Sequence, residues 1–187
     1  RPGKLDGLPA LTREVKLGCV FTQTTWDKEG YAIRDPGSTT YTGAIETAEQ
    51  FGKRLYVEAW QRGWSRAAQK IVIGDGAPWI WNLAQEHFPG ALQIVDLFHA
   101  RQHLWDLARL LFPNDAKRRK GWIGLHQKRW LDKGKIAQLV ASLRSIHSPD
   151  AELAKKIHNE ADYFATNAAR MNYPKFRKQH LFVGSGV

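Results

Sequence analysis

The chain has 187 residues, of which 43% are hydrophobic and 25% charged, a composition that indicates a folded globular protein and excludes a disordered one. No apolar run approaches the roughly 18 residues of a membrane span. The single cysteine, Cys19, excludes an internal disulfide framework and fits a reducing compartment. The net charge of +10 favours a polyanionic partner, most often a nucleic acid.

The positive charge is concentrated in the C-terminal part of the chain. Residues 113–187 contain 15 Lys and Arg against 6 Asp and Glu, a net charge of +9, whereas residues 1–112 contain 13 against 12. Four aromatic residues lie among these cations: Trp122, Trp130, Tyr173 and Phe176. Cations neutralise phosphates and aromatic rings stack on bases, so the pattern favours a nucleic-acid surface. A solvated helical face rich in lysine is the alternative.

Hydrophobic periodicity predicts short strands that alternate with helices in the first 112 residues. In chain order we expect a strand at 15–22, a turn at 35–38, a short strand or helix lead-in at 41–43, a helix at 45–66 that breaks near Gly63, a strand at 70–74, a helix at 77–88, a strand at 91–97 and a helix at 98–112. This order is typical of an α/β fold with a parallel sheet. Three basic helices are expected to follow, at 116–131, 136–146 and 151–171.

Asp75 ends a hydrophobic strand, lies between two glycines and precedes a helix. In parallel sheets the carboxyl ends of strands carry the functional residues, and a carboxylate there can bind a divalent cation such as Mg²⁺. The alternative is that Asp75 only caps the N-terminus of the next helix.

Asp96 ends the following strand, and His99 lies one turn into the next helix. A helix cap with a satisfied polar contact explains this pair equally well. His99 and His103 have the spacing of metal ligands, but Ala100 stands where a metalloprotease motif has glutamate, so we expect no zinc site.

Four stretches together resemble an insertion-sequence transposase of the Kra group, distant kin of the Mutator-like elements. They are TREVKLGCVFTQ at 12–23, GDGAPWI at 74–80, FPGA at 88–91 and VDLFHARQHLW at 95–105. The resemblance covers nearly the whole chain, and the combination is specific although each piece alone is weak. It implies an RNase H-like fold, a mixed sheet flanked by helices, with an Asp, Asp, Glu triad. In the complete protein that triad holds two Mg²⁺ (or Mn²⁺) ions for DNA strand cleavage and transfer.

The resemblance assigns a role to each matching position. Asp75 matches the second acid, a catalytic residue and metal ligand, while Asp96 and His99 match an acid-x-x-His element beside the active centre. From this match we expect His99 to be a catalytic residue, and Asp96 and His103 to be supporting residues near the site. Residues 1–112 then form a partial RNase H-like core, 113–183 a basic all-helical insertion, and 184–187 the lead-in to the last catalytic helix. The expected DNA-binding residues are Lys117, Arg118, Arg119, Lys120, Lys128, Arg129, Lys175, Arg177 and Lys178.

The other two acids of the triad are not assigned in this chain. The resemblance places the first Asp in a strand before Arg1 and the Glu after Val187, and Asp6 lies in a loop. We therefore expect a fragment of a DDE transposase that is inactive by itself. Without the central strand, 15–21 and 70–74 lose a shared neighbour and expose unpaired edges, which predicts marginal stability.

The resemblance also implies partners and a place in the cell. These are double-stranded DNA at the element ends and at the target, self-association of the full-length protein, no membrane, and a prokaryotic cytoplasm near the nucleoid. A catalytically dead, domesticated DNA-binding module is the main alternative. An unrelated nucleotide-handling α/β domain, with Asp75 as a metal ligand, is a third possibility.

Overall fold

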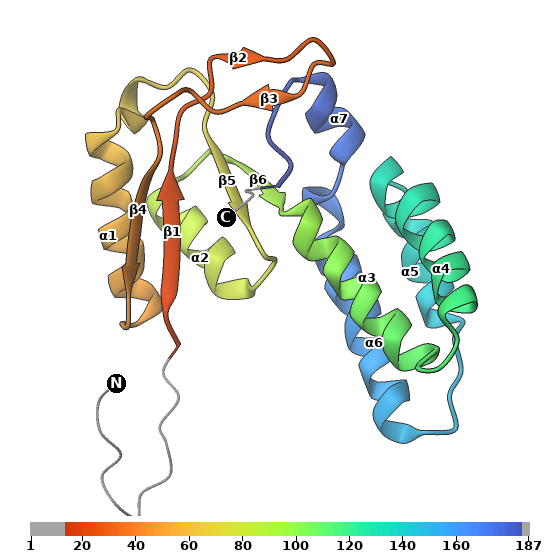
Figure 1. Ribbon diagram of the computed structural model, residues 1–187. Helices are drawn as coiled ribbons and strands as arrows, with labels where there is room; N and C mark the ends of the chain where they lie inside the picture. The colour runs from red at the N-terminus through yellow and green to blue at the C-terminus, as the bar shows by residue number, and fades with distance from the viewer. Residues whose placement is uncertain (1–13, 185–187) are drawn as a thin grey trace, which may run out of the picture.

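The computed structural model describes residues 14–184, which form a mixed α/β protein with three two-stranded sheets. The expected α/β class is confirmed. Figure 1 shows the strands gathered in one half of the molecule, and helices α3 to α6 form the other half. Asp6 and residues 185–187, which carried expectations above, lie outside the described residues.

Strand β1 (Lys16–Val20) pairs antiparallel with β4 (Thr40–Ala44). Helix α1 (Ala48–Gln61) covers one face of this pair, where a Cβ on Gly18 would lie 3.1 Å from a methyl group of Leu55. A capping box between Thr47 and Gln50 starts α1 three residues later than the sequence pattern predicts. The short helix η1 (Trp64–Arg66) follows the expected break at Gly63.

Strands β2 (Thr25–Trp26) and β3 (Ala32–Ile33) form a small hairpin that the sequence analysis did not anticipate. The hairpin lies against the end of the short helix α7 (Tyr173–Lys178), which was also not expected (Figure 1). Trp26 stacks on His180 with ring centroids 4.4 Å apart, and His180 Nδ1 donates to the Gly30 carbonyl at 2.9 Å. These long-range contacts stabilise two strands that are too short to stand alone.

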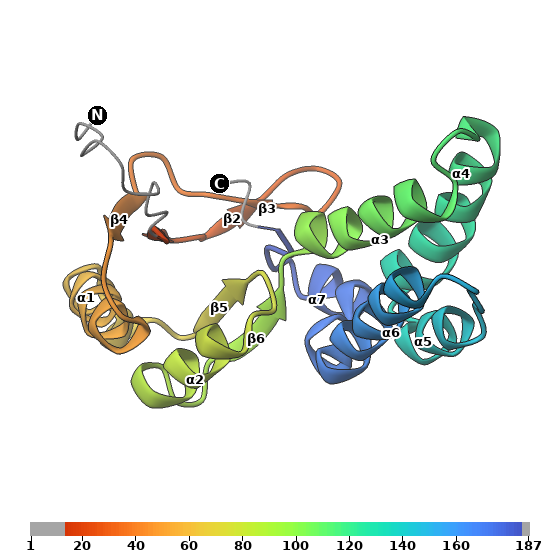
Figure 2. The same cartoon turned by 90° about the horizontal axis from the view of Figure 1, so that it is seen from below.

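Strands β5 (Ile71–Gly74) and β6 (Leu92–Val95) pair in parallel, with Gly74 opposite Val95. Helix α2 (Pro78–His87) connects them, and α3 (Leu97–Leu111) follows β6. Among the described residues β1 pairs only with β4 and β5 only with β6, so both strands have free edges, as expected. In the view from below, the β1–β4 pair and the β5–β6 pair are separate (Figure 2).

Three helical segments follow α3, and the first of them, which carries most of their Lys and Arg residues, changes its pitch. Helix α4 (Ala116–Ile123) continues as the π-helical segment η2 (Gly124–Trp130) and the turn η3 (Leu131–Lys133). The ring of His126 donates to the carbonyl of Trp122 at 2.8 Å, an oxygen that a regular α-helix reserves for a main-chain N–H. This side-chain bond fits the local switch to π geometry. The remaining elements are α5 (Ile136–Arg144), α6 (Ala151–Thr166) and η4 (Ala168–Arg170).

Two hydrophobic cores hold the molecule together. The smaller one lies between α1 and α2, and the larger one joins β6 and α3 to the helices after residue 113. Tyr173 and Phe176 are 0% and 2% exposed in the larger core, and Trp122 and Trp130 pack against it. The expectation that these four aromatic residues face a nucleic acid is therefore wrong for Tyr173 and Phe176, because packing α7 into the core removes their rings from solvent.

Within residues 14–184 no helix combines the length and the apolar character that crossing a membrane requires.

Candidate functional site

Asp75 and Asp96 directly follow the ends of the neighbouring parallel strands β5 and β6, at the same edge of the sheet. The Asp96 main-chain N–H donates to the Gly74 carbonyl at 2.7 Å, which continues the β5–β6 ladder to the last residue. Both acidic residues therefore stand at the carboxyl end of the pair, where the sequence analysis placed them. This edge is the region in which parallel sheets carry ligands.

The side chain of Asp75 is exposed and forms no ion pair within residues 14–184. Its Oδ1 accepts the main-chain N–H of Ala77 at 2.8 Å, which orders the turn in front of α2. The N-cap residue of α2 is Ala77, without a side-chain cap bond. Simple capping by Asp75 is therefore not what the structure shows, and its carboxylate faces solvent.

Asp96 is the N-cap of α3, as the alternative interpretation allowed. Its Oδ1 accepts from the main-chain N–H groups of Phe98 at 2.8 Å and His99 at 3.4 Å. The last described segment also returns to this point, because Leu97 N–H donates to the Val183 carbonyl at 2.7 Å. A Cβ on Gly184 would lie 3.2 Å from Asp96 Oδ1. The chain around residue 184 thus borders the acidic edge.

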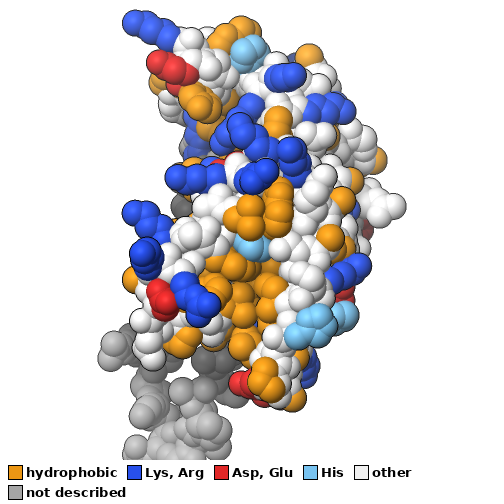
Figure 3. Space-filling model, turned by 90° about the vertical axis from the view of Figure 1, so that its right-hand side faces the viewer, with side chains coloured by type: hydrophobic (Ala, Val, Ile, Leu, Met, Phe, Trp, Pro, Cys, Tyr) orange, Lys and Arg blue, Asp and Glu red, His pale blue; other side chains and the backbone are white. Residues whose placement is uncertain are grey.

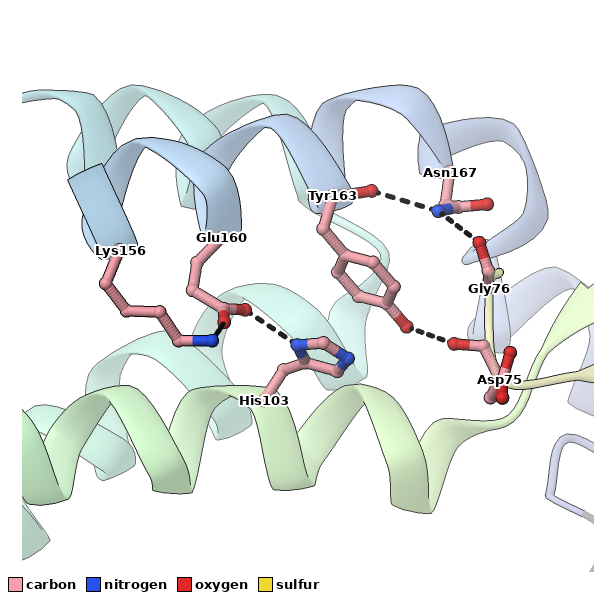
Figure 4. Close-up of polar contacts among 7 residues, drawn as sticks. All are labelled: Asp75, Gly76, His103, Lys156, Glu160, Tyr163 and Asn167. Carbon is pink, nitrogen blue, oxygen red and sulfur yellow. Dashed lines mark hydrogen bonds and ion pairs between the residues drawn. The ribbon is translucent and has the colours of Figure 1, made fainter. Parts of the chain in front are cut away.

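His99 and His103 lie one turn apart on α3, with ring centroids 4.9 Å apart. His103 Nδ1 is 2.7 Å from a carboxylate oxygen of Glu160, and Lys156 Nζ lies 2.9 Å from the other oxygen (Figure 4). Burial alone would raise the pKa of Glu160, but the hydrogen bonds from His103 and Lys156 outweigh it and hold the pKa below its usual value. His103 thus pairs with a buried carboxylate on α6.

Tyr163 of α6 and Asn167, the C-cap residue of α6, were missed by the sequence analysis, and both reach the loop after β5 (Figure 4). Tyr163 donates its hydroxyl to the Asp75 carbonyl at 2.7 Å, and Asn167 Nδ2 lies 3.4 Å from the Gly76 carbonyl. Burial raises the pKa of Tyr163, and the negative charges of Asp75, Glu160 and Asp96 raise it further, so the hydroxyl keeps its proton. The available signal was the spacing of Glu160, Tyr163 and Asn167, which are three and four residues apart, as residues on one face of a helix are.

The expected DNA-binding residues lie on three elements, α4, η2 and α7. Helix α4 and η2 carry six of them, and all are exposed except Arg119, which is half-buried and donates to the Phe112 carbonyl at 3.4 Å. Helix α7 carries exposed Lys175 and Lys178, and half-buried Arg177, whose guanidinium lies 5.9 Å from the centre of the Tyr31 ring. Figure 3 shows the side of the molecule that carries α4 and α5, where Lys and Arg side chains lie around an apolar hollow.

The described residues fit only part of a two-metal site. Asp75 offers an exposed carboxylate of the kind that Mg²⁺ prefers, and Asp96 stands beside it with one oxygen engaged in the helix cap. Within residues 14–184, no group of three His, Cys, Asp or Glu side chains is placed to hold a metal ion. Comparisons with protein-family models, with curated proteins and with solved structures return no match.

Proposed function

We propose that this chain is part of a DDE transposase, an enzyme that cleaves and joins DNA strands at the ends of a mobile element. The observation that carries the proposal is the exposed carboxylate of Asp75 at the carboxyl edge of the β5–β6 pair, beside Asp96. The motifs around these acids resemble the Kra group, and the basic helices offer a surface that complements DNA. The sheet with its free edges is consistent with a partial RNase H-like fold.

In this proposal Asp75 is one ligand of the metal centre. The bound Mg²⁺ (or Mn²⁺) ions would activate the attacking hydroxyl and stabilise the leaving oxygen of the phosphodiester. Asp96 fixes the start of α3 and so holds His99 at the same edge. The remaining ligands would come from outside residues 14–184, because the described residues contain no three-ligand group. We expect the 187-residue chain by itself to be inactive, because the other two acids that the resemblance requires are not assigned within it.

The basic helices supply the second half of the proposal. Exposed cations on α4, η2 and α7 would bind phosphates of double-stranded DNA at the element ends and the target, which adds salt-dependent affinity. The full-length protein would act as a self-associating assembly in a prokaryotic cytoplasm, at the nucleoid.

The direct test substitutes the acid that carries the proposal. In the full-length protein, Asp75→Asn should reduce magnesium-dependent strand cleavage to background and leave DNA affinity nearly unchanged. The 187-residue chain should bind terminal-repeat DNA without nicking it. Unchanged cleavage by the Asp75→Asn protein, or robust nicking by the chain alone, would overturn the proposal.

A catalytically dead DNA-binding module is the second candidate, and the exposed cations of α4 and η2 favour it because they need no metal to bind phosphates. It predicts that the full-length protein binds DNA but shows no cleavage in magnesium or manganese, with or without Asp75. The same assay therefore separates the two functions.

A further inference from the structure

Helix α6 holds the loop that carries Asp75, although Tyr163 lies 88 positions after Asp75 in the sequence. Two successive carbonyls of this loop, those of Asp75 and Gly76, face α6 and contact Tyr163 and Asn167 (Figure 4). Asn167 is 2% exposed, and its Oδ1 also accepts the indole N–H of Trp81 at 2.9 Å. Asn167 therefore joins the loop, through the Gly76 carbonyl, to Trp81 of α2.

The loop is shaped for this contact. Gly76 has φ +102°, a conformation that side chains rarely adopt, and a Cβ at this position would lie 2.6 Å from Tyr163 Cε2. Only glycine allows the tyrosine ring to approach the backbone this closely. The approach places the Tyr163 hydroxyl on the carbonyl of the residue that carries the exposed carboxylate.

The ring of Tyr163 is itself held in place by His103. His103 stacks on it with ring centroids 3.9 Å apart and an interplanar angle of 17°. His103 is in turn bound to Glu160, which is 3% exposed and also pairs with Lys156. A side chain fixed on two sides loses little further freedom when it holds its target, which is how a supporting residue preorganises a site.

We propose that Tyr163, together with Asn167, is a positioning residue for Asp75, so that the helical part of the chain sets the geometry of the acidic edge. The inference rests on the proposed function, because it takes Asp75 as a metal ligand. Tyr163 acts through the main chain of Asp75 and is not itself expected to touch metal or DNA.

The test compares two tyrosine variants, in the 187-residue chain for amide exchange and in the full-length protein for metal binding. Tyr163→Phe removes a hydroxyl bonded to the Asp75 carbonyl, whereas Tyr173→Phe removes one that is buried without a hydrogen-bond partner among residues 14–184. Amide exchange of Ala77, whose N–H donates to Asp75 Oδ1, reports the order of the loop. Broadening of the Gly76 and Ala77 amide signals by Mn²⁺ reports metal affinity, which a purely structural role would not change in the folded protein.

Tyr163→Phe should speed Ala77 exchange roughly three- to tenfold and weaken Mn²⁺ binding by a similar factor, whereas Tyr173→Phe should match the wild type. Unchanged Ala77 exchange and Mn²⁺ affinity in Tyr163→Phe would overturn the inference. Asp75→Asn provides the separate control. If Mn²⁺ broadening persists in Asp75→Asn, the metal role of Asp75 fails, and the Ala77 exchange rates alone then decide whether Tyr163 orders the loop.

Discussion

Arg101 on α3 holds the carboxylate of Asp132 with two parallel hydrogen bonds, Nε to Oδ1 at 3.0 Å and Nη2 to Oδ2 at 2.9 Å. The two side chains are 26% and 16% exposed. Helix α3 begins at the acidic edge, and Asp132 lies at the end of the basic segment α4–η2–η3. The pair therefore ties the candidate site to the candidate DNA surface by a fork-shaped contact.

Asp132→Asn should lower the free energy of unfolding by about 1 to 3 kcal/mol, because it leaves a partly buried guanidinium without its charged partner. Urea denaturation measures this change. Asp106→Asn is the matched control, since Asp106 and its partner Arg109 are 47% and 62% exposed. An exposed pair of this kind contributes at most about 1 kcal/mol, so equal losses in the two variants would contradict the prediction.

Glu160 should give the protein a stability that is lost in acid. Its pKa in the folded protein is below the ordinary value, because the hydrogen bonds and charges of His103 and Lys156 together outweigh burial. A lowered pKa means that the stabilisation is complete above the unfolded value of about 4.3 and disappears as the pH falls through the folded value.

Glu160→Gln should therefore be less stable than the wild type by a constant amount between about pH 5 and 6, and the difference should shrink below about pH 4.3. Thermal or urea unfolding across this range measures it. A difference that grows toward acid would show that the pKa of Glu160 is raised instead.

Gly76→Ala should lower the free energy of unfolding by about 1 to 3 kcal/mol, because alanine is strained at φ +102° and its methyl group meets the Tyr163 ring. Gly121→Ala on α4 is the control, since a Cβ there meets no atom within 4 Å. In a helix this change should stabilise by up to about 1 kcal/mol. Unfolding curves of the two variants should therefore shift in opposite directions, and a neutral Gly76→Ala would count against the close packing at this loop.

The lysines of α4 should bind DNA phosphates. Lys117→Gln with Lys120→Gln should weaken DNA binding and flatten the dependence of log K on log salt by up to about 2, because two phosphate contacts are lost. Lys28→Gln with Lys53→Gln removes two exposed charges elsewhere and serves as the control. Binding isotherms at several salt concentrations give the slopes, and the same flattening in both pairs would indicate only a general charge effect.

The order of the main elements could be predicted from the sequence because its signals are local. Partial alternation indicated β1, short buried apolar runs indicated β5 and β6, and helical patterns indicated α1 to α6 with errors mostly at the ends. The side chain of Asp96, followed by a helical pattern, already suggested the cap that the structure confirms. Each of these signals depends on neighbours within a few residues, so the chain specifies them without knowledge of the fold.

Contacts between distant segments were decided only by the tertiary structure. Aromatic residues among lysines look alike whether they stack on bases or fill a core, and the burial of Tyr173 follows from how α7 packs. The hairpin β2–β3 is too short for a periodic pattern and depends on His180. The bond between Tyr163 and Asp75 depends on the path of α6 past the sheet edge, because no local preference links residues 88 positions apart.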